Sequence, residues 1–199
     1  TLERSSAASD VYKRQKLSII IFGLMQKNVI LVNSNDQKIG LMPKLEAHIR
    51  GILHRAFSVL IFNKKGELLI QQRALNKYHT PGLWSNTCCS HQIDGETNIE
   101  AGKRRLFEEM GFEVELFNFD SFIYNAYFEN GLIEHEFDHI LVGIFEGTPL
   151  INKNEVNDYK WITFDKLQSE IYSSPQNFTV WFRIIFEKYK LSLKKWILQ

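Results

Sequence analysis

The sequence predicts an α+β domain in which a curved, mixed β-sheet lies between helices. Strand-like and helix-like segments alternate along the chain, with no internal repeat and no low-complexity linker. Two hairpin signatures flank a helix, so helices and strands mix within one layered unit. Because 199 residues with 44% hydrophobic content can bury a core of their own, we expect a single domain over residues 25–199.

Residues 1–24 are expected to form a disordered or non-native leader outside this domain. The stretch TLERSSAASDVYKRQ is polar and has neither a helical nor a strand period. The apolar run in KLSIIIFGLM is too short to span a bilayer, and no small-x-small cleavage site follows it. The alternative is that LSIII adds a further strand to the sheet.

The expected strands follow in order. Residues 25–40 begin with a strand pattern and a turn. A first hairpin joins residues 56–62 to residues 67–73 through NKKG, and a second joins residues 122–128 to residues 132–145 through ENG, whose Asn-Gly pair favours a tight turn. Residues 158–171 indicate a strand running into a short helix, and residues 178–198 an amphipathic helix.

The helix between the two hairpins has clear start and stop signals. Thr97 is a typical N-cap, Glu100 completes a capping box, and Gly111 ends the helix after residue 110. The candidates for its buried stripe are Ile99, Leu106 and Met110.

Charge and cysteine content limit the function classes. The chain has 24 Lys+Arg against 23 Asp+Glu, a net charge of +1, so no global field attracts nucleic acid or a membrane. Any phosphate binding must be local. The two cysteines are adjacent, and neighbouring residues rarely form a disulfide because the geometry is strained. We therefore expect a reduced, cytoplasmic protein.

Two short segments carry candidate chemistry. WSNTCCSHQIDGE, residues 84–96, holds both cysteines and a histidine, a pattern compatible with a metal site, a redox pair, a catalytic thiol or a simple turn. A lone cysteine is usually a small buried hydrophobe. Glu108 and Glu109 precede the helix-ending glycine and could form a hard-cation site, or could only pair with Arg104 and Arg105 on an exposed helix.

The helical segment resembles the Nudix box, G-x5-E-x7-R-E-U-x-E-E-x-G-U. Anchored on Gly111, the box positions retained are Glu96, Arg104, Leu106, Glu108, Glu109 and Phe112. Ser90 stands in place of the first glycine, and Arg105 in place of a glutamate. A guanidinium at that position removes a carboxylate ligand and repels a metal ion, which favours gripping a diphosphate over hydrolysing it.

Longer stretches resemble the type I isopentenyl-diphosphate isomerase family over nearly all of residues 25–190. They are LHRAFSVLIFN, QQRALNKYHTPGLWSNTCCSH, RRLFEEMGF, YFENGLIEHEFDHILVG and FTVWFR, in the order of the family. The resemblance implies a Nudix-like fold and the interconversion of isopentenyl and dimethylallyl diphosphate. It also implies that Cys89 is a catalytic thiol, whereas Cys88 falls on a packing position.

That reaction protonates an unactivated alkene and removes a proton from the other side through a tertiary carbocation. Cys89 and Glu136 are expected to be the acid-base pair, either of which can donate, with Tyr124 hydrogen-bonded near the carboxylate. Trp181 offers an aromatic face to the cation, worth about 0.5–2 kcal/mol.

The resemblance further implies two metal sites and a diphosphate-binding site. One divalent ion, Mn²⁺ or Zn²⁺ because imidazole is a softer ligand than oxygen, is expected at His48, His54, His91, Glu134 and Glu136. A Mg²⁺ ion is expected between Glu109, the Cys89 carbonyl and the substrate. The cations implied for the diphosphate are Lys44, Arg73, Lys77 and Arg105.

Two other functions are alternatives. One is a Nudix hydrolase acting on a nucleoside diphosphate derivative, and the other is a Nudix-like binding module without catalysis. The second is disfavoured because Cys89, Tyr124 and Glu136 are all present. The partners expected are a small-molecule diphosphate substrate and no nucleic acid or membrane, with the chain acting as a monomer.

Overall fold

The structure, a computed structural model, describes residues 28–77 and 79–198. The expectations for residues 1–24, a leader or an added strand, and for a domain start at residue 25 therefore lie outside the described residues. The strands of the described residues form one nine-stranded sheet: β1 (Asn28–Val32), β2 (Lys38–Pro43), β3 (His54–Phe62), β4 (Leu68–Arg73), β5 (Trp84–Ser85), β6 (Cys88–Ser90), β7 (Phe117–Tyr127), β8 (Ile133–Ile144) and β9 (Val156–Ile162). The helices described are α2 (Lys44–Arg50), α3 (Asn98–Met110), α4 (Phe164–Ser173), the 3-10 turn η1 (Pro175–Asn177) and α5 (Val180–Ile197).

The centre of the sheet is the parallel pair β3 and β8, in register from His54 beside Glu136 to Phe62 beside Ile144. The far edge of β8 pairs antiparallel with β7. The far edge of β3 meets β1, β6 and β4 in turn. A strand covered on both faces is apolar almost throughout, because neither face meets water. Residues 56–62 of β3 are accordingly all buried.

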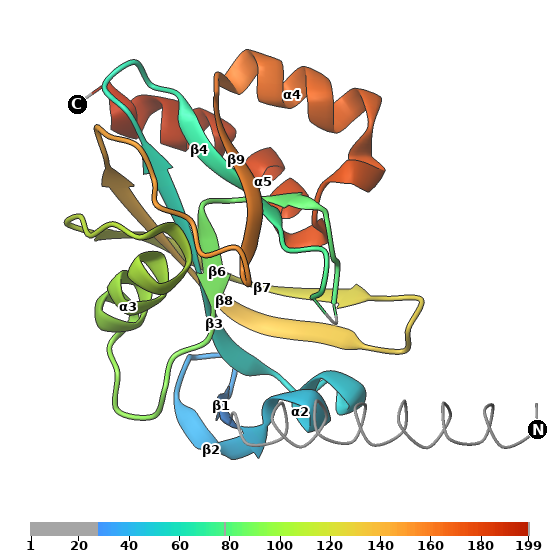
Figure 1. The fold of residues 1–199 in the computed structure, drawn as a ribbon. Helices are drawn as coiled ribbons and strands as arrows, with labels where there is room; N and C mark the ends of the chain where they lie inside the picture. Colours follow the sequence, from blue (N-terminus) through green and yellow to red (C-terminus); the bar gives the residue numbers. More distant parts are fainter. Residues whose placement is uncertain (1–27, 78, 199) are drawn as a thin grey trace, which may run out of the picture.

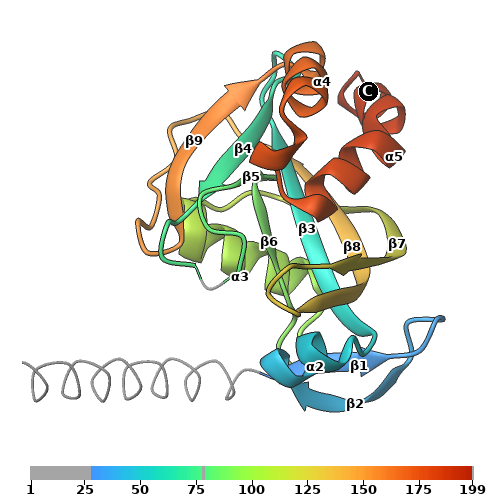
Figure 2. The same ribbon diagram turned by 90° about the vertical axis from the view of Figure 1, so that its right-hand side faces the viewer.

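Helices cover both faces of the sheet, as Figures 1 and 2 show for α3 on one face and for α4 and α5 on the other. Successive side chains of a strand point to opposite faces. Leu60 packs in the cluster that contains Phe182 of α5. Its neighbour Val59 packs in the cluster that contains Leu106 and Met110 of α3. The expected layered α+β architecture is therefore confirmed.

The helix α3 begins and ends as its sequence predicts. The Thr97 side chain accepts a hydrogen bond from the Glu100 amide, and the Glu100 side chain accepts one from the Thr97 amide. Gly111 ends the helix with φ +73°, and a Cβ there would clash with the Leu150 carbonyl oxygen. This region of φ favours glycine, because other residues meet steric strain there. Both ends of α3 are thus fixed by the residues that the sequence indicated.

The two expected hairpins are present, but the first one opens out. β3 and β4 pair only next to their turn, through Ile61 beside Leu69 and Phe62 beside Leu68. Beyond that point β3 pairs with β6 instead of β4. β4 pairs with β5 along one edge and with β9 along the other. The opening leaves room for a site between the strands. The α2 helix was not anticipated from the sequence, and it ends at Gly51.

The final helix matches its expected range closely, since α5 covers Val180–Ile197 within residues 178–198. Its start is fixed on the sheet because the Thr179 amide donates to the Trp84 carbonyl at 2.9 Å. None of the helices that the described residues form has the length and apolar character needed to cross a membrane.

Candidate active site

A pocket of about 110 Å³ lies at the place where the strands of the first hairpin separate. With the exception of His54, all residues expected from the sequence line it: Lys44, His48, Arg73, Lys77, Cys89, His91, Arg105, Glu109, Tyr124, Glu134, Glu136 and Trp181. A larger cavity of about 770 Å³ adjoins it, and both cavities are lined by Lys44, Lys77, Ser90, His91 and Arg105. Lys44, Lys77 and Arg105 therefore stand where the small pocket meets the larger one, whereas Arg73 lines the small pocket alone.

Strand register places the reactive groups. Glu136 of β8 lies beside His54 of β3 on one side and beside Tyr124 of β7 on the other. Cys89 of β6 lies beside Ser58 of β3. Ser58 pairs with β6 along one edge of β3 and with β8 along the other. Cys89 and Glu136 thus come from strands on opposite sides of β3 and line one pocket.

The adjacent cysteines have different surroundings because strand residues alternate between faces. Cys88 is fully buried in the apolar cluster beneath α3, as expected for a packing residue. Cys89 lines the pocket, and burial raises the pKa of its thiol to about 12. Cys89 is therefore a thiol at neutral pH, and both cysteines are free.

Three histidines and one glutamate converge beside Cys89. The Nε2 atoms of His48, His54 and His91 lie 3.8, 3.5 and 3.2 Å from Oε1 of Glu136. One potential ligand atom from each of the four residues lies within 4.8 Å of those of the others. Among the described residues, no other group of this kind is found. The four residues have the donor set of a divalent-metal site.

Hydrogen bonds and burial prepare these imidazoles to bind a metal ion. The Ile52 carbonyl lies 2.7 Å from Nδ1 of His54; because a carbonyl only accepts, Nδ1 carries a proton, and Nε2 is the ring atom left to face the group. Burial lowers the pKa of His48 to about 2 and that of His91 to about 3, so both rings are neutral. Burial raises the pKa of Glu136, but hydrogen bonds with His54 and His91 outweigh it and hold the pKa well below its usual range. The residues present fit a divalent ion.

Glu134 lies beside this group but is not a member of it. Its Oε1 is 2.9 Å from Nε2 of His79, and its Oε2 accepts from the Tyr124 hydroxyl at 3.0 Å. The same hydroxyl lies 2.7 Å from Oε2 of Glu136. Tyr124 therefore connects the two carboxylates, and burial raises the pKa of Tyr124 well above its usual range. Glu134 is the one expected ligand of this site that the structure does not place among the converging atoms.

The cationic side chains differ in what they already bind. Arg73 donates to the carbonyl oxygens of Thr80 and His79, each at 3.1 Å, and its guanidinium lies 5.3 Å from the centre of the Trp181 ring. Lys77 and Arg105 both bind the carboxylate of Glu155. Arg73 thus fixes a loop, while Glu155 holds two cations together at the mouth of the pocket.

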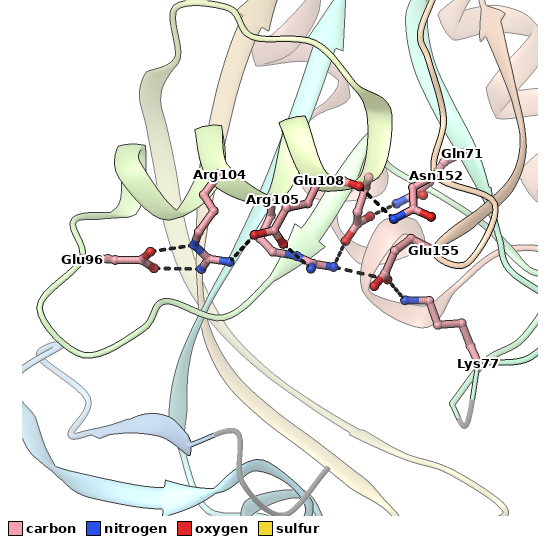
Figure 3. Close-up of polar contacts among 9 residues, drawn as sticks. Gln71, Lys77, Glu96, Arg104, Arg105, Glu108, Asn152 and Glu155 are labelled. Atoms are coloured by element: carbon pink, nitrogen blue, oxygen red, sulfur yellow. Dashed lines mark hydrogen bonds and ion pairs between the residues drawn. The ribbon is translucent and has the colours of Figure 1, made fainter. Parts of the chain in front are cut away.

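The residues that resemble the Nudix box form a chain of ion pairs along α3, drawn in Figure 3. Arg104 binds Glu96 through two hydrogen bonds, of 2.6 and 2.9 Å, and lies 3.5 Å from Glu108. Arg105 binds Glu108 at 2.6 Å and also binds Glu109. Carboxylates that coordinate metal ions in a hydrolase are here paired with guanidinium groups.

The expected Mg²⁺ ligand, Glu109, has both carboxylate oxygens in use. Oε1 accepts from Arg105, and Oε2 accepts from the Gln71 side chain at 3.0 Å. Each carboxylate oxygen has a further lone pair, and Glu109 lines the same pocket as Cys89. A Mg²⁺ ion fits there only if it shares this carboxylate with Arg105.

Trp181 lines the pocket beside Arg73. It is 4% exposed, and its indole Nε1 donates to Oδ1 of Asn86 at 3.1 Å. The Asn86 amide donates to the carbonyls of Cys88 and Val59. The tryptophan ring is thereby fixed to the strand that carries the cysteines.

Sequence reasoning missed several residues that shape the site, namely His79, Glu155, Gln71, Asn86 and Ser58. Their side chains act through partners that are distant in the sequence, such as Glu134 for His79 and Arg105 for Glu155. The sequence gives no sign of these contacts. For His79, the one available signal is its place between the Arg73–Lys77 segment and the Pro81-Gly82 turn.

Comparisons with known proteins agree with this geometry. Residues 52–182 match the NUDIX domain family. The chain is 48% identical over 161 residues to a Photorhabdus laumondii protein named isopentenyl-diphosphate Delta-isomerase 2, covering 81% of this chain and 91% of that protein. It is 49% identical over 173 residues to the isopentenyl-diphosphate Delta-isomerase of Burkholderia multivorans, covering 86% of this chain and 98% of that protein.

Solved structures show a similar fold at low sequence identity. A Deinococcus radiodurans protein superposes with a TM-score of 0.60 at 21% identity, covering 74% of this chain and 90% of that chain. A MutT protein from Methanosarcina mazei superposes with a TM-score of 0.57 at 20% identity, covering 70% of this chain and 94% of that chain. These likenesses concern the fold alone.

Proposed function

The chain belongs to the NUDIX domain family and, within it, to the type I isopentenyl-diphosphate Delta-isomerases, and from this premise we propose how its residues divide the reaction. The reaction interconverts isopentenyl and dimethylallyl diphosphate, in isoprenoid biosynthesis. Hydrolysis of a nucleoside diphosphate derivative is less supported, because the relatives that match most of the chain are isomerases.

The isomerisation adds a proton to one carbon of the substrate and removes a proton from another. The alkene electron pair bonds a proton at the terminal carbon and leaves a tertiary carbocation. The C–H pair of the carbon next to the oxygen-bearing carbon then forms the new double bond, and its proton leaves. We assign the two transfers to Cys89 and Glu136, whose roles exchange in the reverse reaction. Tyr124 holds the Glu136 carboxylate in place through its hydroxyl.

The observation that carries this proposal is the position of Cys89 and Glu136 on strands that flank β3 from opposite edges and line one pocket. A flat alkenyl group between them has an acid on one side and a base on the other. Trp181 lines the same pocket and offers its ring to the cation. That all three residues line one small pocket supports this assignment.

The metal assignment is part of the same proposal. The family and the converging side chains together support divalent metal binding. We assign His48, His54, His91 and Glu136 to an ion that is Mn²⁺ or Zn²⁺, with Glu134 as a fifth ligand. Glu109 and the Cys89 carbonyl are assigned to Mg²⁺ next to the diphosphate. When bound, the first ion stabilises and orients the Glu136 carboxylate.

The diphosphate is assigned to the cationic end of the pocket, where Lys44, Arg73, Lys77 and Arg105 all line the cavity. A guanidinium can bind two phosphate oxygens at once, which suits Arg73 and Arg105 to this role. Because the described part of one chain supplies every residue of the site, the proposal treats the monomer as the catalytic unit. Because the net charge of the chain is only +1, no nucleic acid or membrane partner is part of this proposal.

Incubation of the purified protein with isopentenyl diphosphate, Mg²⁺ and Mn²⁺ tests the proposal. We expect dimethylallyl diphosphate to form without release of phosphate, as followed by phosphorus and proton NMR. Phosphate or pyrophosphate release from this substrate or from nucleoside diphosphate derivatives would instead favour a hydrolase. Tight binding without turnover would favour a binding module.

A further inference from the structure

His79 lines the pocket, but it is not among the proposed metal ligands, proton-transfer groups or diphosphate contacts. It is 5% exposed and lines the pocket together with Glu134, Glu136 and Trp181. Its Nε2 lies 2.9 Å from Oε1 of Glu134, and its ring centre lies 6.5 Å from that of His48. It is therefore a neighbour of the proposed metal site without belonging to the group of converging ligand atoms.

The loop that carries His79 is held in a fixed conformation. Arg73 donates to the backbone carbonyls of His79 and Thr80. Thr80 has φ +47°, a conformation that β-branched residues adopt only where the surroundings impose it. The backbone that presents His79 is thus clamped by a residue that also lies over the Trp181 ring.

Packing fixes the imidazole of His79 as well as its backbone. The ring meets Phe128 edge-on, with ring centres 4.3 Å apart, and its centre lies 6.3 Å from that of Trp181. Phe128 follows the end of β7, and Glu134 is the second residue of β8. His79 therefore ties the loop after β4 to the turn end of the second hairpin, where Glu134 is situated.

Glu134 is held from two sides by these contacts. Tyr124 binds its Oε2 and His79 its Oε1. Both partners are needed to define the direction of a carboxylate, because one hydrogen bond leaves the plane of the group free to rotate. Hydrogen-bond partners of ligating groups typically change metal affinity or activity by about 10–100-fold when they are removed.

We propose that His79 is a positioning residue that orients the Glu134 carboxylate toward the ion held by His48, His54, His91 and Glu136. The inference rests on the metal assignment of the proposed function. It extends that assignment to a side chain that the resemblance did not include. His79 acts here through Glu134 and is not itself assigned as a ligand.

The test compares divalent-ion affinity in the full chain and in its variants, measured by competition of Mn²⁺ and Zn²⁺ with a chelating dye. His79→Ala is expected to weaken the affinity by about 10-fold or more. His79→Gln is expected to retain most of it, because the amide places a donor near the position of the imidazole Nε2. His135→Ala, which removes a neighbouring imidazole that contacts the Gly51 carbonyl, serves as the matched control and is expected to bind like the parent.

A double variant separates positioning from general loosening of the fold. In a Glu134→Gln background, His79→Ala is expected to add little further loss of affinity, since the carboxylate on which it acts is absent. A full additional loss in that background, or wild-type affinity for His79→Ala, would overturn the proposal. Circular dichroism and thermal melting of every variant detect a fold that has not formed, and His79→Asn is then the substitute for His79→Ala.

The isomerase assay of the same proteins distinguishes this inference from the function on which it rests. If the parent chain isomerises isopentenyl diphosphate, His79→Ala is expected to lower kcat at sub-saturating metal while KM for the substrate changes less than about twofold, because the diphosphate cations are untouched. If the parent chain does not isomerise but the affinities differ as described, the proposed function fails and the positioning role stands. A raised KM with unchanged kcat and metal affinity would reject the positioning role.

Discussion

The guanidinium of Arg105 binds the carboxylate of Glu109 one turn further along α3. Arg105 occupies a position where the Nudix box has a glutamate, so a pair of like charges is replaced by an ion pair. Nε of Arg105 is buried and has no hydrogen-bond partner among the residues that the structure describes, although the side chain lines the pocket. The side chain that neutralises Glu109 therefore also brings a positive charge to the pocket wall.

Arg105→Gln is expected to raise KM for isopentenyl diphosphate more than it lowers kcat. A hydrogen bond to a charged group contributes about 1.5–3 kcal/mol, which corresponds to about 10- to 100-fold in binding. Steady-state kinetics measure both constants. Lys103→Gln, an exposed change on the same helix, is the control and should leave both within about twofold. An unchanged KM in Arg105→Gln would remove this residue from the diphosphate site.

Cys89→Ala is expected to abolish isomerisation and to leave the fold intact, because the thiol lines the pocket and is only partly packed in the core. Cys88→Ala should keep a large fraction of the activity and lose a little stability, since it removes one buried sulfur from the cluster beneath α3. Product formation and thermal melting are measured for both. Equal loss of activity in the two variants would show that the assignment of the thiols is wrong.

His91→Ala is expected to lose most of the ion bound at the histidine group, because it removes one of four converging ligands. The bound metal is measured by elemental analysis of protein purified without chelator. His139→Gln is the control, since that side chain lies against Asp36 at 3.1 Å and outside the converging group. Parent-like metal content in His91→Ala would refute the site.

The Glu134→Gln variant measured beside it decides the number of ligands. If Glu134 coordinates the ion, its amide variant should bind the metal more weakly than the parent. A metal content equal to that of the parent would restrict the ligand set to His48, His54, His91 and Glu136.

The free energy of unfolding is expected to fall as the pH drops below about 6.5, the ordinary pKa of an unfolded histidine, and His139 is one cause. Burial lowers the pKa of His139, although the nearby Asp36 carboxylate raises it. The unfolded chain therefore binds a proton that the folded chain resists, so stability present above pH 6.5 is lost below it. Each such group contributes at most about 1.4 kcal/mol per pH unit.

His139→Gln should flatten this loss. The measurement is urea unfolding of metal-free protein at several pH values between 7.5 and 5, for the variant and the parent. The glutamine cannot take up a proton, so the free energy of unfolding of the variant should fall less steeply with falling pH than that of the parent. Parallel curves for the two proteins would rule out His139 as a contributor.

Local sequence signals predicted the elements whose determinants are adjacent in the chain. The capping box of Thr97 and Glu100 and the stop at Gly111 depend on backbone contacts within a few residues, and the second hairpin depends on its Asn-Gly turn. The α2 helix was missed because it has only seven residues. A helical period is hard to recognise over fewer than two full turns.

The site itself depends on contacts that no local signal carries. The parallel register that places His54 beside Glu136 joins residues far apart in the sequence. The resemblance to a family supplied the site residues, and the structure supplied their arrangement, including Glu134 beside the histidine group. His79 was missed because its burial depends on Phe128 and Glu134, which become its neighbours only once the second hairpin has packed against the loop.

The Trp181 ring provides the last test, because the proposed intermediate carries a positive charge that an aromatic face stabilises. Trp181→Leu is expected to lower kcat by about 2- to 30-fold, the equivalent of about 0.5–2 kcal/mol, with a smaller change in KM. Trp181→Phe keeps an aromatic face and should recover part of the loss. Both variants also lose the hydrogen bond to Asn86, so Asn86→Leu in the parent background is the matched control for that contact. If Trp181→Phe is as slow as Trp181→Leu, and Asn86→Leu is equally slow, the tryptophan serves to hold the strand of the cysteines and not to stabilise the cation.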